Sequence, residues 1–412
     1  MLLNRKNKIS LYLILVPLVF LLLPNPFENS QFITYPLISI LILFLAMNIK
    51  DFNQYNINGN IMSIVILYFI LIIFMSLSIL FNNSHIEIDA FVHLLKPIFF
   101  ILILVFTYYI GLNLDTKTIH KSLLAFAYIV LSFQMVVGAA QAFNITAFGY
   151  IYNDMKALPI GKALRIVGTL NNPNILAWIA VQIGAIILIF EKRIIFKILG
   201  IGVVSLIVIF TGSRSFIVIL PTVLIFIQIF KIKRTIYFYI FKFPAYILFF
   251  GLILLLIRWF IVSFKNTFLY LYQLITVFET GELTSVNSFN ERIFMWKDAL
   301  EKLEGSWLLG LGPNSINTLD NDFLYAIVNY GFVYLIIQTI LYLILFISFS
   351  FSKDRKLKIL GQQIILFSYL VGLQADTISG WNYPILIVFY SGILFATFQK
   401  EKASNDLNEN KK

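Results

Sequence analysis

The chain of 412 residues contains no cysteine and few charged residues, since Asp, Glu, Lys and Arg together make up only 12% of it. Without cysteine, the protein can form no disulfide framework, no thiolate nucleophile and no cysteine-ligated metal site. The scarcity of charge excludes an ordinary soluble domain, in which about a quarter of the residues are charged. Histidine is scarce as well, with three residues in the whole chain.

Hydrophobic residues, by contrast, make up 60% of the chain. Apolar runs of about 15 to 25 residues recur along nearly its whole length, and we therefore predict an all-α, polytopic integral membrane protein with about twelve transmembrane helices. No soluble insert is long enough to hold its own core, so residues 1–412 are predicted to form a single membrane domain. The predicted spans are 9–23, 31–47, 61–81, 97–112, 122–143, 174–190, 194–210, 215–230, 243–262, 322–350, 359–374 and 383–399.

The distribution of lysine and arginine predicts the orientation of these spans. Roughly two thirds of the 31 lysines and arginines fall in segments on one predicted side, which identifies that side as cytoplasmic. Both termini are then cytoplasmic, and the first apolar run is a retained span, because Pro24-Asn25-Pro26 follows it where a signal peptide would have a small-residue cleavage site. The net charge of +11 reflects this topology and does not indicate nucleic-acid binding.

The remaining cations lie on the predicted outer side, against the usual bias. Arginine is enriched among them, and its planar guanidinium can bind a phosphate group through two parallel hydrogen bonds. A phosphate-bearing ligand outside the membrane would account for this enrichment. The outer cations are Lys96, Lys156, Lys162, Arg165, Arg214, Arg258, Lys265, Arg292, Lys297 and Lys302.

Residues 165–174 form the most polar entrance to any predicted span. They read Arg-Ile-Val-Gly-Thr-Leu-Asn-Asn-Pro-Asn, directly before the apolar run 175–190. Polar groups at the mouth of a span usually face a ligand or a water-filled cavity rather than lipid. We therefore expect Arg165, Asn171 and Asn174 to bind substrate.

The longest polar connection, residues 263–321, is predicted to be a large extracytoplasmic loop between the ninth and tenth spans, carrying short helices. Ser288-Phe-Asn-Glu291 has the pattern of a capping box, which would open an amphipathic helix over Arg292–Leu303. Glu291 could serve as a cap or as a catalytic carboxylate. Arg292 would stand in the first turn of this helix, where a cation is unfavourable because it opposes the helix dipole. Arg292 is therefore a candidate for ligand binding.

Two carboxylates and an amide, Asp320-Asn321-Asp322, follow a glycine turn at Gly310 and Gly312 and open the tenth span. One interpretation is that Asp320 or Asn321 only caps the helix. The other is that a carboxylate here deprotonates a sugar hydroxyl, with Asp320 as the first candidate for the general base. The glycines do not form a dinucleotide-binding loop, because no strand precedes them and no third glycine follows at the required spacing.

Two further groups of residues lie on the predicted outer side. His85, Asp89 and His93 could be drawn as a metal site, but their spacing matches no zinc motif, so a solvated loop is the expectation and no metal is predicted. Tyr150 and Tyr152 could stack on sugars, although interfacial aromatic residues are the ordinary reason for such tyrosines.

Short motifs thus follow one another in a fixed order along the predicted outer face. They are Arg165-x-x-Gly168-Thr-Leu-x-Asn-Pro173-Asn174, Thr211-Gly212-Ser213-Arg214, Arg292-x3-Trp296-x2-Ala299-Leu300, Gly310-x-Gly312 and Asp320-Asn321. This order resembles the bacterial O-antigen ligase and polymerase superfamily over roughly residues 160–350. In that family an outer loop lies over a cavity in the membrane, and periplasmic arginines engage the diphosphate of a polyprenol-linked glycan. The resemblance implies this diphosphate role for Arg165 and Arg214, with Arg292 as a third candidate.

The resemblance also favours one activity within the superfamily. Ligases of this family typically have a histidine immediately before the asparagine that this chain has as Asn321, but Asp320 stands there, and no histidine follows His120. The chain therefore looks more like a polymerase of O-antigen or capsular repeat units. Such an enzyme transfers a growing glycan from undecaprenyl diphosphate to a new lipid-linked repeat unit, on the outer face of the bacterial cytoplasmic (inner) membrane.

The expected chemistry needs no cofactor and no metal. Arginines would stabilise the departing diphosphate in a poorly hydrated cavity, and a carboxylate of Asp320, Asp322 or Glu291 would accept the proton of the acceptor hydroxyl, with Asn321 helping to hold the sugar. The expected partners are undecaprenyl-diphosphate-linked oligosaccharide, the lipid bilayer, and a chain-length regulator and flippase of the same pathway. An O-antigen ligase, a lipid-linked glycan flippase or other transporter, and a noncatalytic scaffold are the alternatives, although no internal repeat of the kind found in transporters is apparent.

Overall fold

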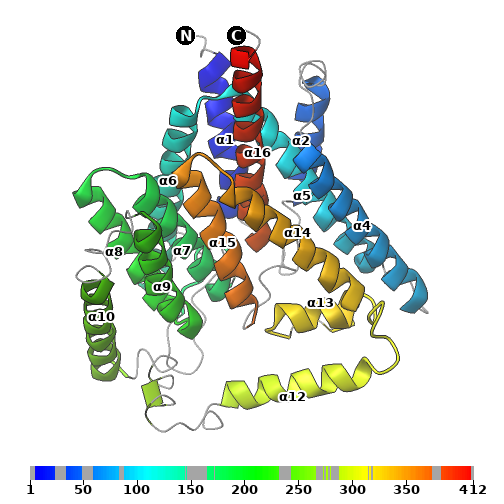
Figure 1. Ribbon diagram of the computed structural model, residues 1–412. Helices are drawn as coiled ribbons and strands as arrows, with labels where there is room; N and C mark the ends of the chain where they lie inside the picture. The colour runs from blue at the N-terminus through cyan, green and yellow to red at the C-terminus, as the bar shows by residue number, and fades with distance from the viewer. Residues whose placement is uncertain are drawn as a thin grey trace. The chain divides into compact units, whose positions relative to one another are not determined.

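The computed structural model describes residues 5–23, 34–48, 59–82, 88–143, 145, 165–170, 172–231, 243–265, 272, 275–276, 279, 287–313, 315–316, 319–373 and 382–409. Within these residues the protein is all-helical, and no β-strand occurs. The helices are α1 (Arg5–Leu22), α2 (Thr34–Met47), α4 (Gly59–Asn82), α5 (Ile88–Asn113), α6 (Thr116–Ala142), α7 (Pro173–Phe190), α8 (Ile194–Phe210), α9 (Arg214–Lys231), α10 (Phe243–Ser263), α12 (Asn287–Lys302), α13 (Asp322–Tyr330), α14 (Phe332–Ser350), α15 (Arg355–Gly372) and α16 (Asn382–Glu409) (Figure 1).

Six of these helices are long and apolar enough to cross a membrane, as expected of a protein embedded in a bilayer. The described part of every apolar segment predicted from the sequence lies on helix, with boundaries that differ by a few residues, and the tenth segment is divided into α13 and α14 at Gly331. The six long apolar segments are Gly59–Phe81, His93–Asn113, Thr116–Ala142, Pro173–Phe190, Arg214–Lys231 and Phe332–Ser350.

The chain forms two compact units, and each is described by itself. The first unit comprises residues 1–20, 31–122 and 291–412, and the second comprises residues 21–30 and 123–290. That residues 1–412 form a single membrane domain remains a prediction.

In the first unit, α16 packs along α5 at very short range (Figure 1). Glycines allow this approach: a Cβ atom at Gly111 would lie 2.6 Å from the Cβ of Ala396, and one at Gly392 would lie 2.0 Å from Thr107 Oγ1. Small residues at helix contacts are the usual means by which membrane helices approach closely, because apolar surface alone gives no preference for protein over lipid. Near this contact, the ammonium group of Lys400 donates hydrogen bonds to the carbonyls of Gly111 and Leu114 at the end of α5.

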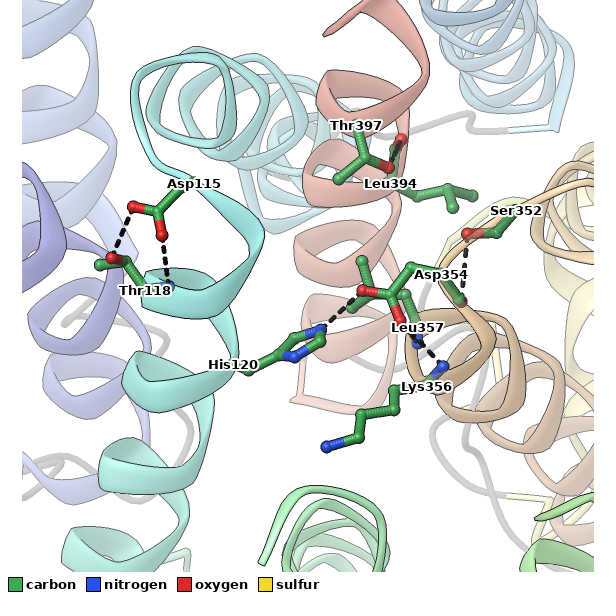
Figure 2. Close-up of polar contacts among 9 residues, drawn as sticks. All are labelled: Asp115, Thr118, His120, Ser352, Asp354, Lys356, Leu357, Leu394 and Thr397. Atoms are coloured by element: carbon green, nitrogen blue, oxygen red, sulfur yellow. Dashed lines mark hydrogen bonds and ion pairs between the residues drawn. The ribbon is translucent and has the colours of Figure 1, made fainter. Parts of the chain in front are cut away.

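A polar connection in the same unit joins the start of α6 to the start of α15 (Figure 2). His120 Nε2 donates to Asp354 Oδ2 at 2.6 Å, and Asp354 Oδ1 accepts from the backbone N–H groups of Lys356 and Leu357, so Asp354 caps α15. Burial of the Asp354 carboxyl would raise its pKa, but the hydrogen bonds from His120 and from the two N–H groups outweigh burial and hold the pKa below its ordinary value.

In the second unit, α7 is the central helix and packs against both α8 and α9. Its sequence is apolar on all faces, which is typical of a helix that is covered on every side. Trp178 is completely buried against Phe216 of α9, at 6.2 Å between ring centroids. On the α8 side, Gly184 leaves room for Val204, whose Cγ1 would lie 3.2 Å from an added Cβ.

Candidate functional site

The residues proposed for function form two clusters, one in each unit. The arginine cluster consists of Arg165, Asn174, Thr211, Ser213 and Arg214 in the second unit. The carboxylate cluster consists of Arg292, Asp320, Asn321 and Asp322 in the first unit, with Glu291 nearby in sequence. Asn171, Tyr150, Tyr152 and His85 lie outside the described residues.

The segment before α7 is held in place by two glutamines of α6. Gln141 Oε1 accepts hydrogen bonds from the N–H groups of Val167 and Gly168, at 3.1 and 2.8 Å, and Gln134 Oε1 accepts from Thr169 N at 3.1 Å. Gly168 has a φ of 59° and an added Cβ would lie 2.3 Å from Gln134 Oε1, so only glycine fits this turn. The amide side chains of Gln134, which is buried, and of Gln141 thus fix the backbone that carries Arg165.

Arg165 lies between the start of α7 and the turn that joins α8 to α9. Its Nε donates to the carbonyl of Thr211 at 2.9 Å, and its Nη2 lies 3.5 Å from Asn174 Oδ1, at the limit of a hydrogen bond. Ser213 Oγ donates to the same Asn174 oxygen at 2.8 Å. Gly212, with a φ of 64°, lets the turn pass close to the guanidinium stem. Residues of two motifs that are about 40 positions apart in the sequence therefore meet, as the structure of long apolar helices joined by short turns allows.

Arg214 is the first residue of α9, where the helix dipole places a partial positive charge. The neighbouring start of α7 is capped by its own Asn172, whose side chain accepts from Asn174 N and Ile175 N. Two arginines beside the N-terminal end of a helix dipole make this corner of the second unit electropositive, which suits a phosphate-bearing ligand.

Arg165 also has a structural role. Thr211 is the C-cap residue of α8, so the Arg165 hydrogen bond places a cation at a helix C-terminus, where the dipole favours positive charge. A test of ligand binding by Arg165 must therefore separate lost binding from a weakened α8–α9 turn.

In the carboxylate cluster, Arg292 and Asp320 form an ion pair. Nε and Nη2 of Arg292 both lie 2.9 Å from Asp320 Oδ2. One helical turn further along α12, Trp296 Nε1 donates to the carbonyl of Leu319 at 2.6 Å. These two contacts fasten α12 to the segment that leads into α13, and they bring together two residues proposed for function.

The predicted start of this amphipathic helix is wrong. α12 begins at Asn287 rather than at Arg292, so Ser288 and Glu291 lie within the helix and do not form a capping box at its first residue. Arg292 is then the sixth residue of the helix, beyond the first turn, and the argument from an unfavourable helix dipole does not hold. The ion pair with Asp320 is the physical reason for an arginine at this position. Glu291 is exposed to solvent.

The hydrophobic pattern of this helix places Ile293, Trp296, Leu300 and Leu303 on one face. Leu303 is fully buried as expected, and so is Ala299, whereas Leu300 is 38% exposed. The buried face therefore differs from the predicted one at Leu300.

Asp320 and Asn321 have different tasks at the start of α13. Asn321 is the N-cap, since its Oδ1 accepts from Leu324 N at 3.0 Å, which confirms the capping interpretation for this residue. Asp320 adopts a left-handed conformation with a φ of 49°, the only non-glycine residue with a positive φ in the described ranges. Backbone strain of this kind persists where the surroundings over-determine a conformation, and here the ion pair with Arg292 does so.

Asp322, the first residue of α13, is 3% exposed, in contrast to the half-exposed Asp320. It lies close enough to Tyr334 and Tyr342 to interact with both of them electrostatically. The two candidate bases of the sequence motif therefore differ in kind: Asp320 is paired with a guanidinium at the surface, and Asp322 is buried beside tyrosines.

The predicted glycine turn is present and packs against the junction of α13 and α14. Gly310 and Gly312 have φ values of 68° and 97°, and the N–H groups of Leu311 and Gly312 donate to the carbonyls of Val328 and Asn329. A Cβ at Gly310 would lie 2.7 Å from the backbone of Asn329 and its successors. These glycines thus allow close backbone contact, as expected of turn residues.

Sequence reasoning missed Asn329 and misjudged His93. Asn329 is fully buried; its carbonyl accepts from Ser78 Oγ of α4 at 2.9 Å as well as from Gly312 N, and so it joins α4, the glycine turn and α13. An amide within the apolar run 322–350 was the available signal. His93 lies on helix α5 rather than in a solvated loop, and its Nδ1 lies 2.8 Å from Tyr330 Oη.

Among the described residues, no three histidine, aspartate or glutamate side chains gather as a possible set of metal ligands. The sequence matches no protein-family model and no curated protein.

Proposed function

We propose that the protein is a membrane glycosyltransferase that polymerises lipid-linked repeat units of a polysaccharide, such as an O-antigen or a capsule. The donor would be a glycan on undecaprenyl diphosphate, and the acceptor a single repeat unit on the same lipid. The observation that carries the proposal is the arginine cluster, in which Arg165, Asn174 and Ser213 meet beside Arg214 at the start of α9.

The arginine cluster supports binding of the diphosphate. When the bond between the anomeric carbon and the phosphate oxygen breaks, the leaving diphosphate gains negative charge. Guanidinium groups and helix N–H groups stabilise such charge strongly in a poorly hydrated site, because they are already oriented before the reaction. We assign this role to Arg165 and Arg214.

The carboxylate cluster supports proton transfer. The acceptor hydroxyl forms the new bond to the anomeric carbon and must lose its proton, which a carboxylate takes up. Asp320 is the first candidate because it is partly exposed and held in place by Arg292, while the buried Asp322 is the second. Because Arg292 forms an ion pair with Asp320, we propose that its role is to position this carboxylate, in preference to contacting the diphosphate.

The membrane topology belongs to the same proposal. We propose twelve spans with both termini in the cytoplasm and an outward-facing active site, in the cytoplasmic membrane of a bacterium. The six long apolar helices support a membrane location, and the distribution of cations supports the orientation. A flippase and a chain-length regulator are the expected partners.

The direct test supplies the purified protein with undecaprenyl-diphosphate-linked repeat units as the only substrate, in the presence of a metal chelator. A polymerase builds a ladder of chain lengths that gel electrophoresis resolves. A requirement for lipid A-core would instead identify a ligase, and transport without formation of glycosidic bonds would identify a flippase; either result would contradict the proposal.

A further inference from the structure

A cleft in the first unit lies between α4, α5, the end of α13 and α14. It encloses about 410 Å³, including the space open to solvent at its mouth. Its polar lining consists of Tyr68, Lys96, Tyr330, Tyr334, Gln338 and Tyr342. The space between these side chains is narrow, so it can take a small group such as a phosphoryl group or a hydroxyl but not a sugar ring.

Lys96 supplies the cleft with a buried positive charge. The residue is only 8% exposed, and it lies one turn into the apolar helical segment that begins at His93. Charged groups buried among membrane helices are rare, and they usually mark a site of function. The compact ammonium group of lysine is a common ligand for phosphate.

Tyr68 of α4 supplies a hydrogen-bond donor to the lining of the same cleft. It is 3% exposed, and within the described part of the protein its hydroxyl has no hydrogen-bond partner. A buried hydroxyl without a partner costs free energy, so a ligand that accepts its hydrogen bond would recover that cost. The cleft therefore offers a cation and an unused donor to one small group.

The remaining tyrosines are held in fixed positions around this space. Tyr330 Oη lies 2.8 Å from His93 Nδ1, and the rings of Tyr330 and Tyr334 lie 4.7 Å apart between centroids. Tyr334 and Tyr342 are 8% and 3% exposed. A site of this kind is already formed before its ligand arrives, which lowers the entropic cost of binding.

From these contacts we infer that the lysine–tyrosine cleft binds a phosphoryl group, carried by a lipid or free as inorganic phosphate, with Lys96 and the Tyr68 hydroxyl as its ligands. Binding of this group does not depend on the proposed polymerase activity. Asp322, the carboxylate that acts on Tyr334 and Tyr342, opposes an anion in the cleft and weakens its binding.

The test measures binding to the purified full-length protein in a phosphate-free maltoside detergent. The probes are undecaprenyl phosphate, undecaprenol and inorganic phosphate, and the readouts are the dissociation constant and the melting temperature. We expect undecaprenyl phosphate to bind at least 10-fold more tightly than undecaprenol, because only the former presents an anion to Lys96. If inorganic phosphate binds, and Lys96→Gln abolishes this binding, the phosphoryl group alone is sufficient. If only undecaprenyl phosphate binds, the lipid chain is a second requirement.

Substitutions separate this site from a structural role of the same side chains. Lys96→Gln should weaken binding of undecaprenyl phosphate by about 10-fold or more, and Lys96→Arg should restore most of it. Tyr68→Phe removes only the hydroxyl without a partner, so the ligand-free protein should melt at the same temperature or higher while binding weakens about 3-fold to 10-fold. The exposed Lys302 provides the matched control, since Lys302→Gln should leave binding unchanged.

Asp322→Asn tests the sign of the charge that the cleft accepts. Removal of the opposing carboxylate should tighten the binding of undecaprenyl phosphate. Equal binding of undecaprenol and undecaprenyl phosphate, or unchanged binding in a folded Tyr68→Phe protein, would overturn the inference whatever the outcome of the polymerase assay.

Discussion

Arg165 makes two different contacts with one planar group, to the Thr211 carbonyl and to Asn174. Lysine keeps the charge but cannot reproduce this fork, nor two parallel bonds to a diphosphate. We expect Arg165→Lys to lower polymerase activity by about 10-fold to 100-fold, the loss typical of one or two charge-assisted hydrogen bonds. The measurement is the rate of ladder formation by purified protein.

A control shows whether this loss concerns the ligand. Arg258 is an exposed arginine of the same unit, paired with Glu279, and Arg258→Lys should keep wild-type activity. If Arg165→Lys lowers the melting temperature strongly and the surviving folded fraction is fully active, Arg165 serves the α8–α9 turn and not the substrate.

Asp320 combines a left-handed backbone with an ion pair, and asparagine tolerates the first but cannot form the second. If Asp320 is the general base, Asp320→Asn should remain folded while its turnover falls roughly 10²-fold to 10⁴-fold. Asp298 is also a carboxylate in an ion pair on α12, with Lys302, so Asp298→Asn should leave turnover unchanged. Turnover by Asp320→Asn at the wild-type rate would transfer the role of base to Asp322 or Glu291.

At this scale the sequence predicted the local conformation of some residues, but not which distant residues meet. The cap at Asn321 and the glycine turn followed from local preferences, and both are present. The Arg292–Asp320 pair was not predicted, because its members are 28 residues apart and only the fold brings them together. The cleft that Tyr68 and Lys96 line was not predicted either, because no local sequence pattern links two separate helices.

Among the helices, the junction of α13 and α14 is the least tolerant of change. Gly331 has a φ of 89° and a ψ of 167°, a conformation that only glycine adopts readily, and a Cβ there would lie 2.1 Å from the Leu308 carbonyl oxygen. We expect Gly331→Ala to abolish activity and to lower the melting temperature, with strain of about 1–3 kcal/mol from the backbone alone before the clash is counted.

A glycine in open surroundings provides the comparison. Gly202 lies within α8 with no atom near an added Cβ, so Gly202→Ala should be neutral or stabilise the protein by about 0.5–1 kcal/mol. Thermal unfolding in detergent measures both variants. Equal effects of the two substitutions would show that the α13–α14 junction can relax.

The length and composition of the apolar runs predicted where helices occur, but not where they break or begin. The run 322–350 was predicted to be one span, and its division at Gly331 follows from the approach of the glycine turn, which hydropathy does not report. α12 begins five residues before its predicted start, because the pattern at Ser288 and Glu291 occurs within helices as well as at their ends.

For the whole molecule, the absence of cysteine permits a clean test of orientation. Single cysteines at Lys302 and Lys353 are well suited, because both side chains are exposed, at 58% and 67%. Ser352, the residue before Lys353, is only 8% exposed, so a cysteine at this position would react poorly with the reagent on either side. In intact cells an impermeant thiol reagent should label Lys302→Cys and spare Lys353→Cys, while permeabilised cells should label both. Labelling of Lys353→Cys in intact cells would reverse the proposed topology.

The hydrogen bond between His120 and Asp354 makes the stability of the first unit depend on pH. Asp354 has a lowered pKa in the folded protein, so its contribution to stability is fully present above its ordinary value of 3.8 and is lost as the pH falls through the folded pKa. Asp354→Asn keeps the cap of α15 but not the charge, and should be about 1–3 kcal/mol less stable at pH 7. The gap between the melting temperatures of the two proteins should begin to close as the pH falls below about 4 and should vanish below the folded pKa; a gap that stays constant would show that the carboxylate charge is not linked to folding. If Asp354 faces the cytoplasm as proposed, near-neutral surroundings keep this carboxylate ionised throughout the life of the cell, and the acid limb of the stability curve appears only in isolated protein.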